Sequence, residues 1–458
     1  MKKLIVIFFF GLSVAYLSFH YFMGKGNFHN KFSFLDTDQK QIIKKYIFPY
    51  NFITQQQLQI SSLQDQIARF SALKFEYLFK ESLIDIKVKK VDEIKLSKNK
   101  IIKKYKLLNG FYTGIHNDLP GSGFIDFHQN NLFILSARGI LAYTKKIDDE
   151  FSFKQIKNNI NDFINLQQFE KDKAFSLKDL LISKNRIFIS FTEEIKDNCW
   201  NTSVIYGNLN YEIINFTKLF SSKNCIHSYK NIDKEFNALQ SGGRIVDLDD
   251  NNILLSIGDY RSRSLAQNTA NINGKIIKIN IYDSSYEIVS IGHRNPQGLY
   301  FDKENNLILA SEHGPQGGDE INLIEVDRIS TDDPLNYGWP IASMGEHYGG
   351  KDAKNNKNKY DKYPLYKSHK QFGFIEPLTY FVPSIGISEI TKISENTYAF
   401  GSLNQRTLYL FNIINNNSID IFEKFELDER IRDLKFENKK LSMYLEDSGS
   451  IGIMEIDD

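Results

Sequence analysis

The chain has 458 residues, and its 57 lysines and arginines nearly balance its 56 aspartates and glutamates, which leaves a formal net charge of +1 at pH 7. Nucleic-acid-binding domains are usually strongly basic, so this balance argues against nucleic acid as a partner. The length suits either several ordinary domains or one large all-β unit.

The N-terminal segment combines a basic start with a long apolar run. Lys2 and Lys3 precede mostly apolar residues from Leu4 to Met23, a stretch long enough in helical form to cross a bilayer. No small-residue cleavage site follows, so we expect residues 1–26 to be an uncleaved anchor in a bacterial inner membrane, with the remainder in the periplasm. The alternative is a signal segment that is removed on secretion to the periplasm.

Residues 27–100 are rich in Gln, Lys and long aliphatic side chains. Apolar residues recur there at alternating three- and four-residue steps, at Ile60, Leu63, Ile67, Phe70 and Tyr77. This pattern predicts a helical stalk, with Pro49 stopping a first helix and Thr54 capping a second. This short apolar stripe, called the seam below, fits either a dimerising coiled coil or a helix packed on the neighbouring domain. The lysines from Lys87 to Lys106 predict a basic, solvent-exposed linker.

From Phe124 onward, short apolar or alternating segments occur in pairs, and a polar turn that contains Asn joins each pair. The six pairs begin at Phe124, Leu180, Ile245, Leu299, Ile390 and Leu434. Each pair predicts an antiparallel hairpin. Long loops between the hairpins fit propeller blades better than the even spacing of a β-sandwich. We therefore predict an all-β fold in which residues 101–458 form a six-bladed β-propeller.

The chain contains only two cysteines, Cys199 and Cys225. In an exported chain, an even number of cysteines is typical of disulfide pairing, and two thiols cannot build a zinc site alone. The sequence leaves open one disulfide or two unpaired buried thiols.

Three polar motifs are the most informative part of the sequence: residues 292–299 (Gly-His-Arg-Asn-Pro-Gln-Gly-Leu), residues 311–322 (Ser-Glu-His-Gly-Pro-Gln-Gly-Gly-Asp-Glu-Ile-Asn) and residues 336–340 (Asn-Tyr-Gly-Trp-Pro). They contain too many charged and turn-forming residues for a core. Loops of this kind present fixed donors and backbone carbonyls, so the motifs predict a site for a polyanion or a metal. The loop from Ile341 to Phe372 is expected either to shape a substrate cleft or to be a disordered insertion.

These motifs resemble those of the soluble glucose and sorbosone dehydrogenases that use pyrroloquinoline quinone, which include the aldose sugar dehydrogenases. The likeness runs from about Gly121 to the C-terminus. It implies a six-bladed propeller in which the quinone cofactor lies over the central channel, and a sugar or related alcohol as the substrate.

The resemblance also implies roles for individual residues. It places Arg294, Asn295 and Gln297 on the cofactor, together with Arg430 and Arg432. Alternate residues of a strand share one face, so Arg430 and Arg432 can point together into the channel. Taken alone, they would be interpreted as a pair of surface salt bridges.

Calcium in this family binds the quinone and also occupies a second site. The resemblance assigns the first ion to the backbone carbonyls of Gly314 and Pro315, which suit a hard cation. It assigns the second ion to the Glu320 carboxylate and the Tyr337 carbonyl.

The catalytic base is where the sequence departs from the family. Family members place a His four residues before the Arg of a His-x-x-Gly-Arg run, and an Asp beyond the next strand orients it. This chain has Gln240 at the position of the base, whereas Asp259 matches the orienting carboxylate. An amide cannot accept the proton, and loss of a positioned base typically costs about 10²- to 10⁴-fold in rate. Asp259 acting through a water, His227 or His293 are the less favoured replacements.

A second departure follows Gly401-Ser402-Leu403, where the family commonly has a Lys or Arg near the quinone. Here Asn404 follows, and Arg406 is the nearest substitute. Three functions remain: a quinone-dependent sugar dehydrogenase with an altered base, a noncatalytic propeller that binds the quinone, a carbohydrate or a protein partner, and calcium-assisted lactone hydrolysis. The last has only the shared architecture in its favour.

Overall fold

The structure is a computed structural model that describes residues 39, 42, 45, 46, 49–97, 100–107, 122–144, 150–171, 174–329, 333–353 and 356–456. The chain divides into two units, residues 1–70 and residues 71–458. Among the described residues, no helix has both the length and the apolar character needed to span a membrane. The anchor expected from Leu4 to Met23 lies outside the described residues.

Helix α4 (Pro49–Ser82) corrects the predicted stalk, because Pro49 begins a helix where we expected it to end one, and Thr54 lies inside that helix. The physical reason is that the first turn of a helix makes no use of the N–H that proline lacks. In the first unit, Ile60, Leu63 and Ile67 are exposed. Whether this stretch of α4 dimerises remains a prediction.

The last turns of α4 belong to the second unit and pack on its strands. Leu73 lies in a core cluster with Phe124, and Phe79 is buried in the neighbouring cluster. Lys80 is buried as well, and its Nζ donates to Oδ1 of Asn161 at 2.5 Å. This part of the predicted stalk is therefore a helix packed on its own domain, one of the two alternatives for the seam.

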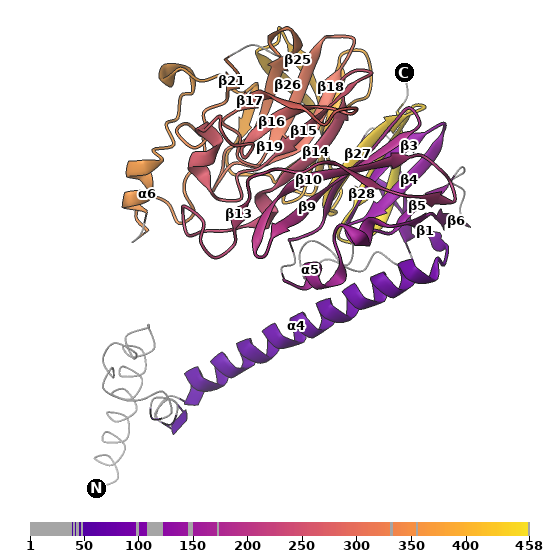
Figure 1. Cartoon of the computed structure of the whole chain (residues 1–458), viewed down its shortest axis with the longest axis horizontal. Coiled ribbons are helices and arrows are strands. Elements are labelled where there is room, and N and C mark those ends of the chain that lie inside the picture. Colours follow the sequence, from indigo (N-terminus) through magenta and orange to yellow (C-terminus); the bar gives the residue numbers. More distant parts are fainter. Residues whose placement is uncertain are drawn as a thin grey trace. The chain divides into compact units, whose positions relative to one another are not determined.

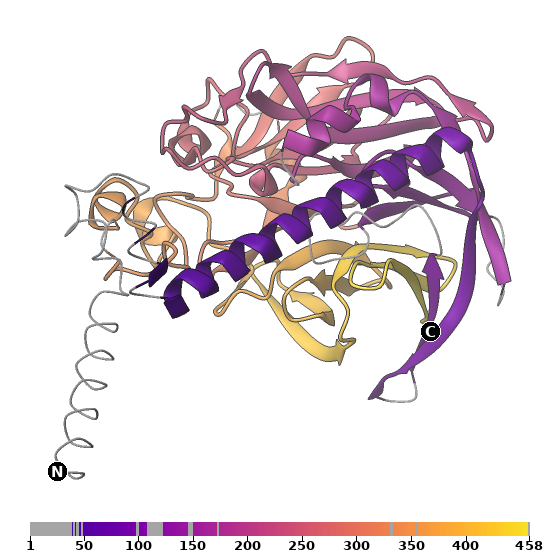
Figure 2. The ribbon, with the colours of Figure 1, turned by 90° about the horizontal axis from the view of Figure 1, so that it is seen from below.

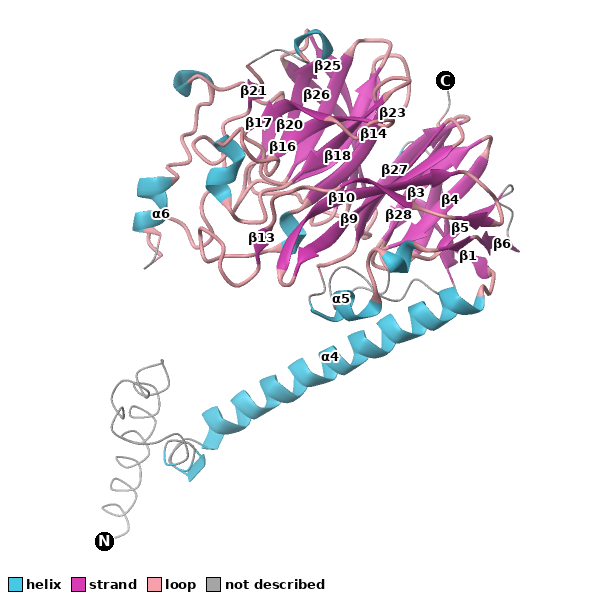
Figure 3. Cartoon of the chain, viewed as in Figure 1, coloured by secondary structure: helices cyan, strands magenta, loops and turns pink. Residues whose placement is uncertain are grey.

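Strands make up most of the second unit (Figure 3). In the described residues they form six antiparallel arrays of four strands, each called a blade below. Blade 1 contains β3 (Gly123–His128), β4 (Asn131–Ser136), β5 (Leu141–Thr144) and β6 (Glu150–Gln155). Blade 2 contains β8 (Leu177–Ser183), β9 (Arg186–Lys196), β10 (Cys199–Asn208) and β12 (Thr217–Phe220), and β13 (Ile226–His227) also pairs with β10.

The next three blades follow in chain order. Blade 3 contains β14 (Gly242–Asp247), β15 (Asn252–Ile257), β16 (Lys275–Asn280) and β17 (Tyr286–Ile291), extended by β21 (Leu335–Asn336). Blade 4 contains β18 (Pro296–Asp302), β19 (Leu307–Glu312), β20 (Asp319–Glu325) and β22 (Thr379–Phe381). Blade 5 contains β23 (Ile387–Lys392), β24 (Thr397–Ser402), β25 (Thr407–Ile414) and β26 (Ser418–Glu426).

Blade 6 draws its strands from both ends of the unit. It contains β27 (Ile431–Glu437), β28 (Lys440–Leu445), β29 (Ser450–Glu455) and β2 (Ile101–Leu107). The remaining described elements are short: β7 (Lys157–Asn158) pairs with β11 (Ile213–Ile214), and the helices α5 (Leu166–Lys171) and α6 (Lys357–Lys362) lie at the periphery (Figure 3).

All six predicted hairpins are confirmed, and each forms the first two strands of a blade. The first strands neighbour one another in a closed ring, in the order β3, β8, β14, β18, β23, β27 and back to β3. This arrangement is all-β and propeller-like, as predicted. The period-two alternation of the hairpins produces it, because one face of every strand packs against the next blade.

Strands β1 (Ile86–Lys95) and β2 close the ring and correct the predicted basic linker. Strand β2 pairs with β29 of blade 6, and β1 pairs with both β2 and β6 of blade 1 (Figures 1 and 2). The lysines that suggested a linker alternate with buried residues such as Ile86 and Val88. Alternation of this kind is typical of a strand with one solvated face.

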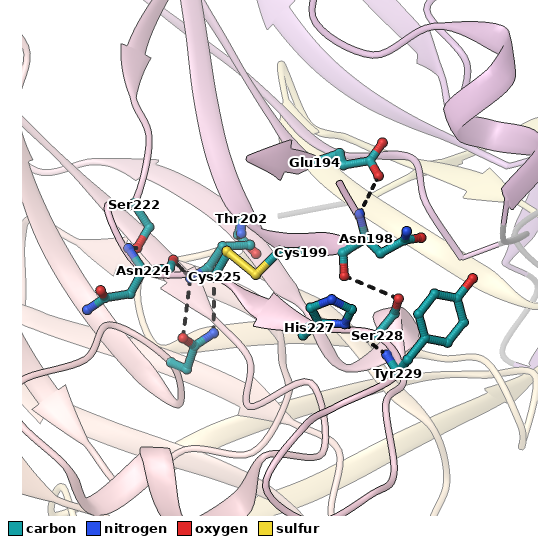
Figure 4. The surroundings of a disulfide bond; sticks show 12 residues. Glu194, Asn198, Cys199, Thr202, Ser222, Asn224, Cys225, His227, Ser228 and Tyr229 are labelled. Atoms are coloured by element: carbon teal, nitrogen blue, oxygen red, sulfur yellow. Dashed lines mark hydrogen bonds between the residues drawn. A yellow bond between two sulfur atoms is a disulfide. The ribbon is translucent and has the colours of Figure 1, made fainter. Parts of the chain in front are cut away.

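Of the two alternatives that the sequence left open, the structure has the disulfide, between Cys199 and Cys225, which are 26 residues apart in the sequence (Figure 4). It joins the start of β10 to the segment just before β13. The two strands also pair directly, Cys199 with His227 and Trp200 with Ile226. The bond therefore fastens a two-residue strand to the third strand of blade 2.

Candidate active site

The predicted site residues lie at one face of the ring. The first two strands of a blade are antiparallel, so the start of the first strand and the end of the second lie side by side. Gln240 precedes β14 and Asp259 follows β15, whereas Arg294 precedes β18 and Gly314 follows β19. The hairpin geometry thus brings residues that are far apart in the sequence to the same end of the channel.

A cavity of about 660 Å³ opens at this face. Of the residues predicted for the site, it is lined by Gln240, Arg294, Asn295, Gln297, Gly314, Pro315, Arg430 and Arg432. The cavity lining does not include Asp259, Glu320, Tyr337 or Arg406. Its lining is strongly basic, since Lys178, Arg244 and Arg261 join three of the predicted arginines and the single acidic side chain is Asp319.

Gln240 ends the short helix η3 (Ala238–Gln240), in which the backbone N–H of Leu239 donates to the Asn237 side chain. A side chain at Gly258 would place its Cβ 2.2 Å from the Gln240 carbonyl oxygen, so only glycine permits this close approach of η3 to the end of β15. The approach brings Gln240 against Asp259, with the amide nitrogen 3.2 Å from Asp259 Oδ1 when the amide is oriented to suit both of its neighbours.

The other end of the Gln240 amide is also engaged. Its oxygen accepts hydrogen bonds from Arg261 Nε at 2.9 Å and from Arg294 Nη2 at 3.0 Å. The amide therefore bridges a carboxylate and two guanidinium groups at the edge of the cavity. This position can orient a ligand, but it offers no group that accepts a proton near neutral pH.

Asp259 is fully buried behind Gln240. It accepts hydrogen bonds from the indole Nε1 of Trp339 at 2.8 Å and from the backbone N–H of Arg261 at 2.8 Å. Burial raises its pKa, although the nearby charge of Arg294 opposes the shift. Because Asp259 does not line the cavity, the geometry does not favour Asp259 as a base that acts through water.

The two histidines considered as replacement bases also lie away from the cavity lining. Nδ1 of His293 lies 2.9 Å from Glu312 Oε1, and Nε2 lies 2.8 Å from Ser290 Oγ, so both nitrogens of this buried ring are used in the core. His227 lies on β13 beside the disulfide (Figure 4). The histidine that does line the cavity is His313, which the sequence reasoning missed.

Arg294 is held at the cavity wall from several sides. Its backbone N–H donates to Glu312 Oε2 at 2.7 Å, and its Nη1 donates to the carbonyl oxygens of His313, at 2.8 Å, and of Gly314. The guanidinium also lies 5.4 Å from the centre of the Trp339 ring. A guanidinium fixed in this way is preorganised for an anionic ligand.

Arg430 and Arg432 converge, as the alternation on a strand predicted. Arg430 Nε lies 2.9 Å from one oxygen of Glu446, and Arg432 Nη2 lies 3.0 Å from each oxygen of the same carboxylate. Burial alone would raise the pKa of Glu446, but the charges of Arg432 and Arg430 hold it below its ordinary value. Two guanidiniums share one carboxylate, so this wall keeps a net positive charge toward the cavity.

Comparisons with known proteins identify the family of the chain. The family model for Glucose / Sorbosone dehydrogenase matches residues 176–454, which is more than half of the chain. The chain belongs to the glucose/sorbosone dehydrogenase family.

Two curated proteins of similar sequence are matched over part of their length. An uncharacterised protein of Synechocystis, slr1608, is 30% identical over 224 residues, covering 42% of this chain and 50% of that protein. The aldose sugar dehydrogenase YliI of Escherichia coli is 30% identical over 178 residues, covering 36% of this chain and 44% of that protein. The chain thus spans about half the length of the curated relatives it matches.

A solved structure supports the fold. The PQQ-bound form of an aldose sugar dehydrogenase from Streptomyces coelicolor superposes with a TM-score of 0.51 at 16% identity, covering 80% of this chain and 97% of that chain. At this identity the likeness concerns the fold alone.

The residues that the family resemblance assigns to the first calcium ion are suitable in type. Gly314 and Pro315 line the cavity, and Asp319 Oδ1 accepts the Gly314 N–H at 3.1 Å, which fixes the turn. Their carbonyls also have partners within the protein, because Arg294 donates to Gly314 and Ser384 Oγ donates to Pro315 at 3.4 Å. A bound cation would share the Gly314 oxygen with Arg294.

The residues assigned to the second calcium ion surround a small void of about 10 Å³, lined by Glu320, Tyr337 and Glu312 among others. Burial and the neighbouring Glu312 raise the pKa of Glu320 well above its ordinary value. His369 lies nearby, with Nε2 3.8 Å from Glu320 Oε1, and neither of its ring nitrogens has a hydrogen-bond partner among the described residues. The buried Glu320 carboxylate, with its raised pKa, fits a cation at this position.

Arg406 does not take the place that the sequence suggested for it. Its Nε lies 3.1 Å from Asp447 Oδ2, its side chain is about half exposed, and Asn404 lines the cavity instead. Arg406 lies in a turn with φ of 53°, and its ion pair with Asp447 holds its side chain outside the cavity lining.

Besides His313, three features of the site were not predicted from the sequence. Arg261 follows Asp259 by two residues, and that spacing in the Gly258-Asp259 turn was the available signal. Tyr348, from the loop expected to shape a cleft, lies over both Arg261 and Arg294, with its ring centre 5.2 and 5.9 Å from their guanidinium carbons. Arg244 occupies the last position of the run that begins at Gln240, and it also lines the cavity.

Arg244 crosses the channel and ties several blades together. Its Nη1 lies 3.0 Å from Asp179, 3.0 Å from Glu389 and 2.9 Å from Asp433. It also donates to the backbone carbonyls of Gln297 and Arg432. Its charge is thus taken up by the channel carboxylates.

Proposed function

We propose that this chain is an exported, six-bladed quinoprotein that oxidises a sugar (an aldose) or a related alcohol in the 660 Å³ cavity, with pyrroloquinoline quinone and Ca²⁺ as cofactors. The observation that carries the proposal is the meeting of Arg294, Arg430 and Arg432 with the Gly314 and Pro315 carbonyls around one cavity. Fork-shaped cations and hard carbonyl oxygens suit a tricarboxylate and its calcium ion.

The residues of the chain would bind and position the reactants. Arg430 and Arg432 provide a cationic wall for the cofactor carboxylates, and Asn295 is held between Gln297 and the backbone of Gly242. Gly314 and Pro315 would hold the calcium ion, and Glu320 and Tyr337 a second one. When bound, the quinone would accept a hydride from the sugar carbon, while the hydroxyl proton leaves separately.

The rate of this reaction depends on the residue at the position of the catalytic base. Gln240 occupies the position next to Asp259 where the family resemblance implies a histidine, and its amide cannot take the hydroxyl proton. Water in the open cavity then has to accept it. We therefore expect turnover that is slower by about 10²- to 10⁴-fold than with a positioned base.

The same amide favours one alternative function. Both ends of Gln240 are engaged, by Asp259 on one side and by Arg261 and Arg294 on the other. A site locked in this way suits a propeller that binds the quinone, a carbohydrate or a protein partner without turnover. Lactone hydrolysis has no comparable observation in its favour.

Replacing Gln240 with histidine tests the proposal. In the full-length chain loaded with pyrroloquinoline quinone and Ca²⁺, Gln240→His is expected to raise dye-linked sugar oxidation by about 10²-fold or more, because Asp259 is in place to orient the ring. Gln240→Asn is the matched control and should give no gain. The double change Gln240→His with Asp259→Asn should lose most of the gain, since it removes the orienting carboxylate.

Cofactor absorbance separates the outcomes. Calcium-dependent binding of the quinone with turnover supports the oxidoreductase. Binding without turnover in both the parent chain and Gln240→His supports the noncatalytic alternative. Absence of cofactor binding would refute both quinone-based functions.

The location of the protein is part of the proposal. The Cys199–Cys225 disulfide supports an oxidising compartment such as the periplasm, where such bonds persist. Attachment to the inner membrane and secretion to the periplasm remain the two alternatives.

A further inference from the structure

The cavity has cationic groups on two opposite walls. In the ring of six blades, blade 3 and blade 6 are three steps apart in either direction, so they face each other across the channel. Arg430 and Arg432 come from blade 6, whereas Arg261 follows β15 of blade 3. The cofactor carboxylates assigned above account for the wall of blade 6, which leaves the wall of blade 3 without a ligand.

Arg261 has no salt bridge to an Asp or Glu among the described residues. Its Nε donates to the Gln240 oxygen, and its guanidinium lies 5.2 Å from the centre of the Tyr348 ring. Glu235 is the carboxylate that raises the pKa of Arg261, but it already pairs with Arg263 at 2.7 Å and with Lys359 at 2.5 Å. The positive charge of Arg261 is therefore directed into the cavity without a partner of opposite sign.

Arg294 adds a second charge at the same point. Both guanidiniums donate to one oxygen, that of Gln240, at 2.9 and 3.0 Å. Burial lowers the pKa of Arg261, and the neighbouring charge of Arg294 lowers it further. Two like charges held this close are stabilised by an anion that bridges them.

The amide at position 240 is consistent with such an arrangement. A histidine that accepted a proton there would place a third cation within hydrogen-bonding distance of two guanidiniums. Gln240 is neutral and satisfies both of them. The combination of Gln240 and Arg261 resembles a receptor for an anionic group beside the reacting position.

We propose that the sugar bound in this cavity is acidic, and that Arg261 holds its carboxylate or phosphate group at the wall of blade 3, whereas Arg294 remains a contact of the cofactor. This inference rests on the proposed function, in which the wall of blade 6 is occupied by the cofactor. The ring of Tyr348 lies over both guanidiniums, so it stacks on the cations beside the proposed anion position.

Calorimetric titration of sugars tests the proposal. The full-length chain in detergent, loaded with pyrroloquinoline quinone and Ca²⁺, is titrated at low ionic strength with D-glucuronate, D-glucose 6-phosphate and D-glucose. At least one acidic sugar is expected to bind about tenfold or more tightly than glucose, as for a charge-assisted contact. The preferred acid identifies the group as a carboxylate or a phosphate.

Arg261→Gln should weaken binding of the preferred acidic sugar about tenfold while glucose stays within about twofold, because the lost interaction is specific for the anion. Arg186→Gln is the matched control, since Arg186 lies outside the cavity lining and stacks on Tyr282. Glucose binding as tightly as both acids, or equal losses for acid and glucose in Arg261→Gln, would overturn the proposal.

Two further measurements keep the result interpretable. If Arg261→Gln fails to fold, Arg261→Lys retains the charge, and added salt should weaken binding of the acidic sugar but not of glucose. A lack of salt dependence would then refute the proposal. Quinone binding is monitored separately by the absorbance of the cofactor. Sugar selectivity is also measured on the cofactor-free chain. A failure of quinone binding is therefore distinguished from a failure of sugar selectivity.

Discussion

The protonation of individual carboxyl groups in the channel depends on the buried charges around them. Four buried carboxyl groups, those of Asp126, Asp179, Glu389 and Asp433, face two cations, the buried Arg244 and the partly buried Lys435. Several of these carboxylates also accept backbone N–H groups from a neighbouring blade, as Asp433 does from Ile125 at 2.7 Å. With more acids than cations, at least one carboxyl is expected to keep its proton near neutral pH.

Glu389 is the residue where this excess has a measurable effect on stability. Burial raises its pKa from 4.5 to about 7, against the opposing charge of Arg244. Between these two values the folded state holds a proton that the unfolded chain has released, so the free energy of unfolding falls as the pH rises through this window. Above about pH 7 both states are ionised, and the loss is complete.

Glu389→Gln should therefore flatten the fall in stability between pH 5 and pH 7, since the amide does not titrate. Urea midpoints measured at half-unit pH steps give the result. Glu395→Gln, at the exposed turn between β23 and β24, is the control and should retain the slope of the parent chain. Equal slopes in both variants would show that Glu389 is ionised throughout this range.

Hairpins are the elements that the sequence describes best, and the disulfide is the covalent link between elements. Strand β13 has only two residues, and it is joined to β10 by two paired residues and by the Cys199–Cys225 bond. Its neighbour Ser228 adds a hydrogen bond to the Asn198 carbonyl at 3.2 Å (Figure 4). So short a strand depends on the cross-link for its position.

Replacing both cysteines with serine is expected to lower the free energy of unfolding by about 3 kcal/mol, the value for a loop of this length. Chemical denaturation of the double variant, with and without dithiothreitol, measures the effect. Reductant should destabilise the parent chain by a similar amount and leave the variant unchanged. A parent chain that is insensitive to reductant would contradict the expectation.

At the scale of the whole molecule, the ring of blades is closed by strands that lie outside the six predicted hairpins. Blade 6 receives β2 as its fourth strand, and β1 joins β2 to β6 of blade 1, so the ring is held by pairing across its junction. The pairing is distant in sequence, as between Ile102 and Met454. Without these strands, β29 and β6 would present unpaired edges.

A chain that begins after Leu107 should therefore fail to give a stable monomer. Among the described residues, it lacks seven buried apolar side chains, those of Leu73, Phe79, Ile86, Val88, Ile102, Tyr105 and Leu107. At about 1.5 to 3 kcal/mol each, their loss approaches the whole net stability of a typical domain. A chain that begins at Ser71 keeps both strands and is the control.

Thermal unfolding and size-exclusion chromatography compare the two truncated chains. We expect a cooperative transition and a monomer peak for the chain that begins at Ser71. Aggregation or loss of cooperativity is expected for the shorter chain. Equal melting temperatures would show that the ring closes without β1 and β2.

The sequence by itself determined the six hairpins, the all-β class and eight residues of the cavity lining, Gln240 and Arg294 among them, and it offered a disulfide as one of two states for the cysteines. These features depend on local patterns: alternation along a strand, Asn-containing turns, and motifs whose hairpin geometry directs them to one face. Patterns of this kind can be identified from a short stretch of sequence alone.

Only the tertiary structure decided the features that depend on distant partners. Residues 86–95 and 101–107 are strands because β6 and β29 offer them edges, Arg406 leaves the cavity because Asp447 pairs with it, and Arg261 enters the cavity because Gln240 and Tyr348 meet it there. A lysine-rich stretch or a single arginine carries no local sign of such a partner. The physical reason is that strand pairing and ion pairing depend on which groups the folded ring brings together, not on their separation in the sequence.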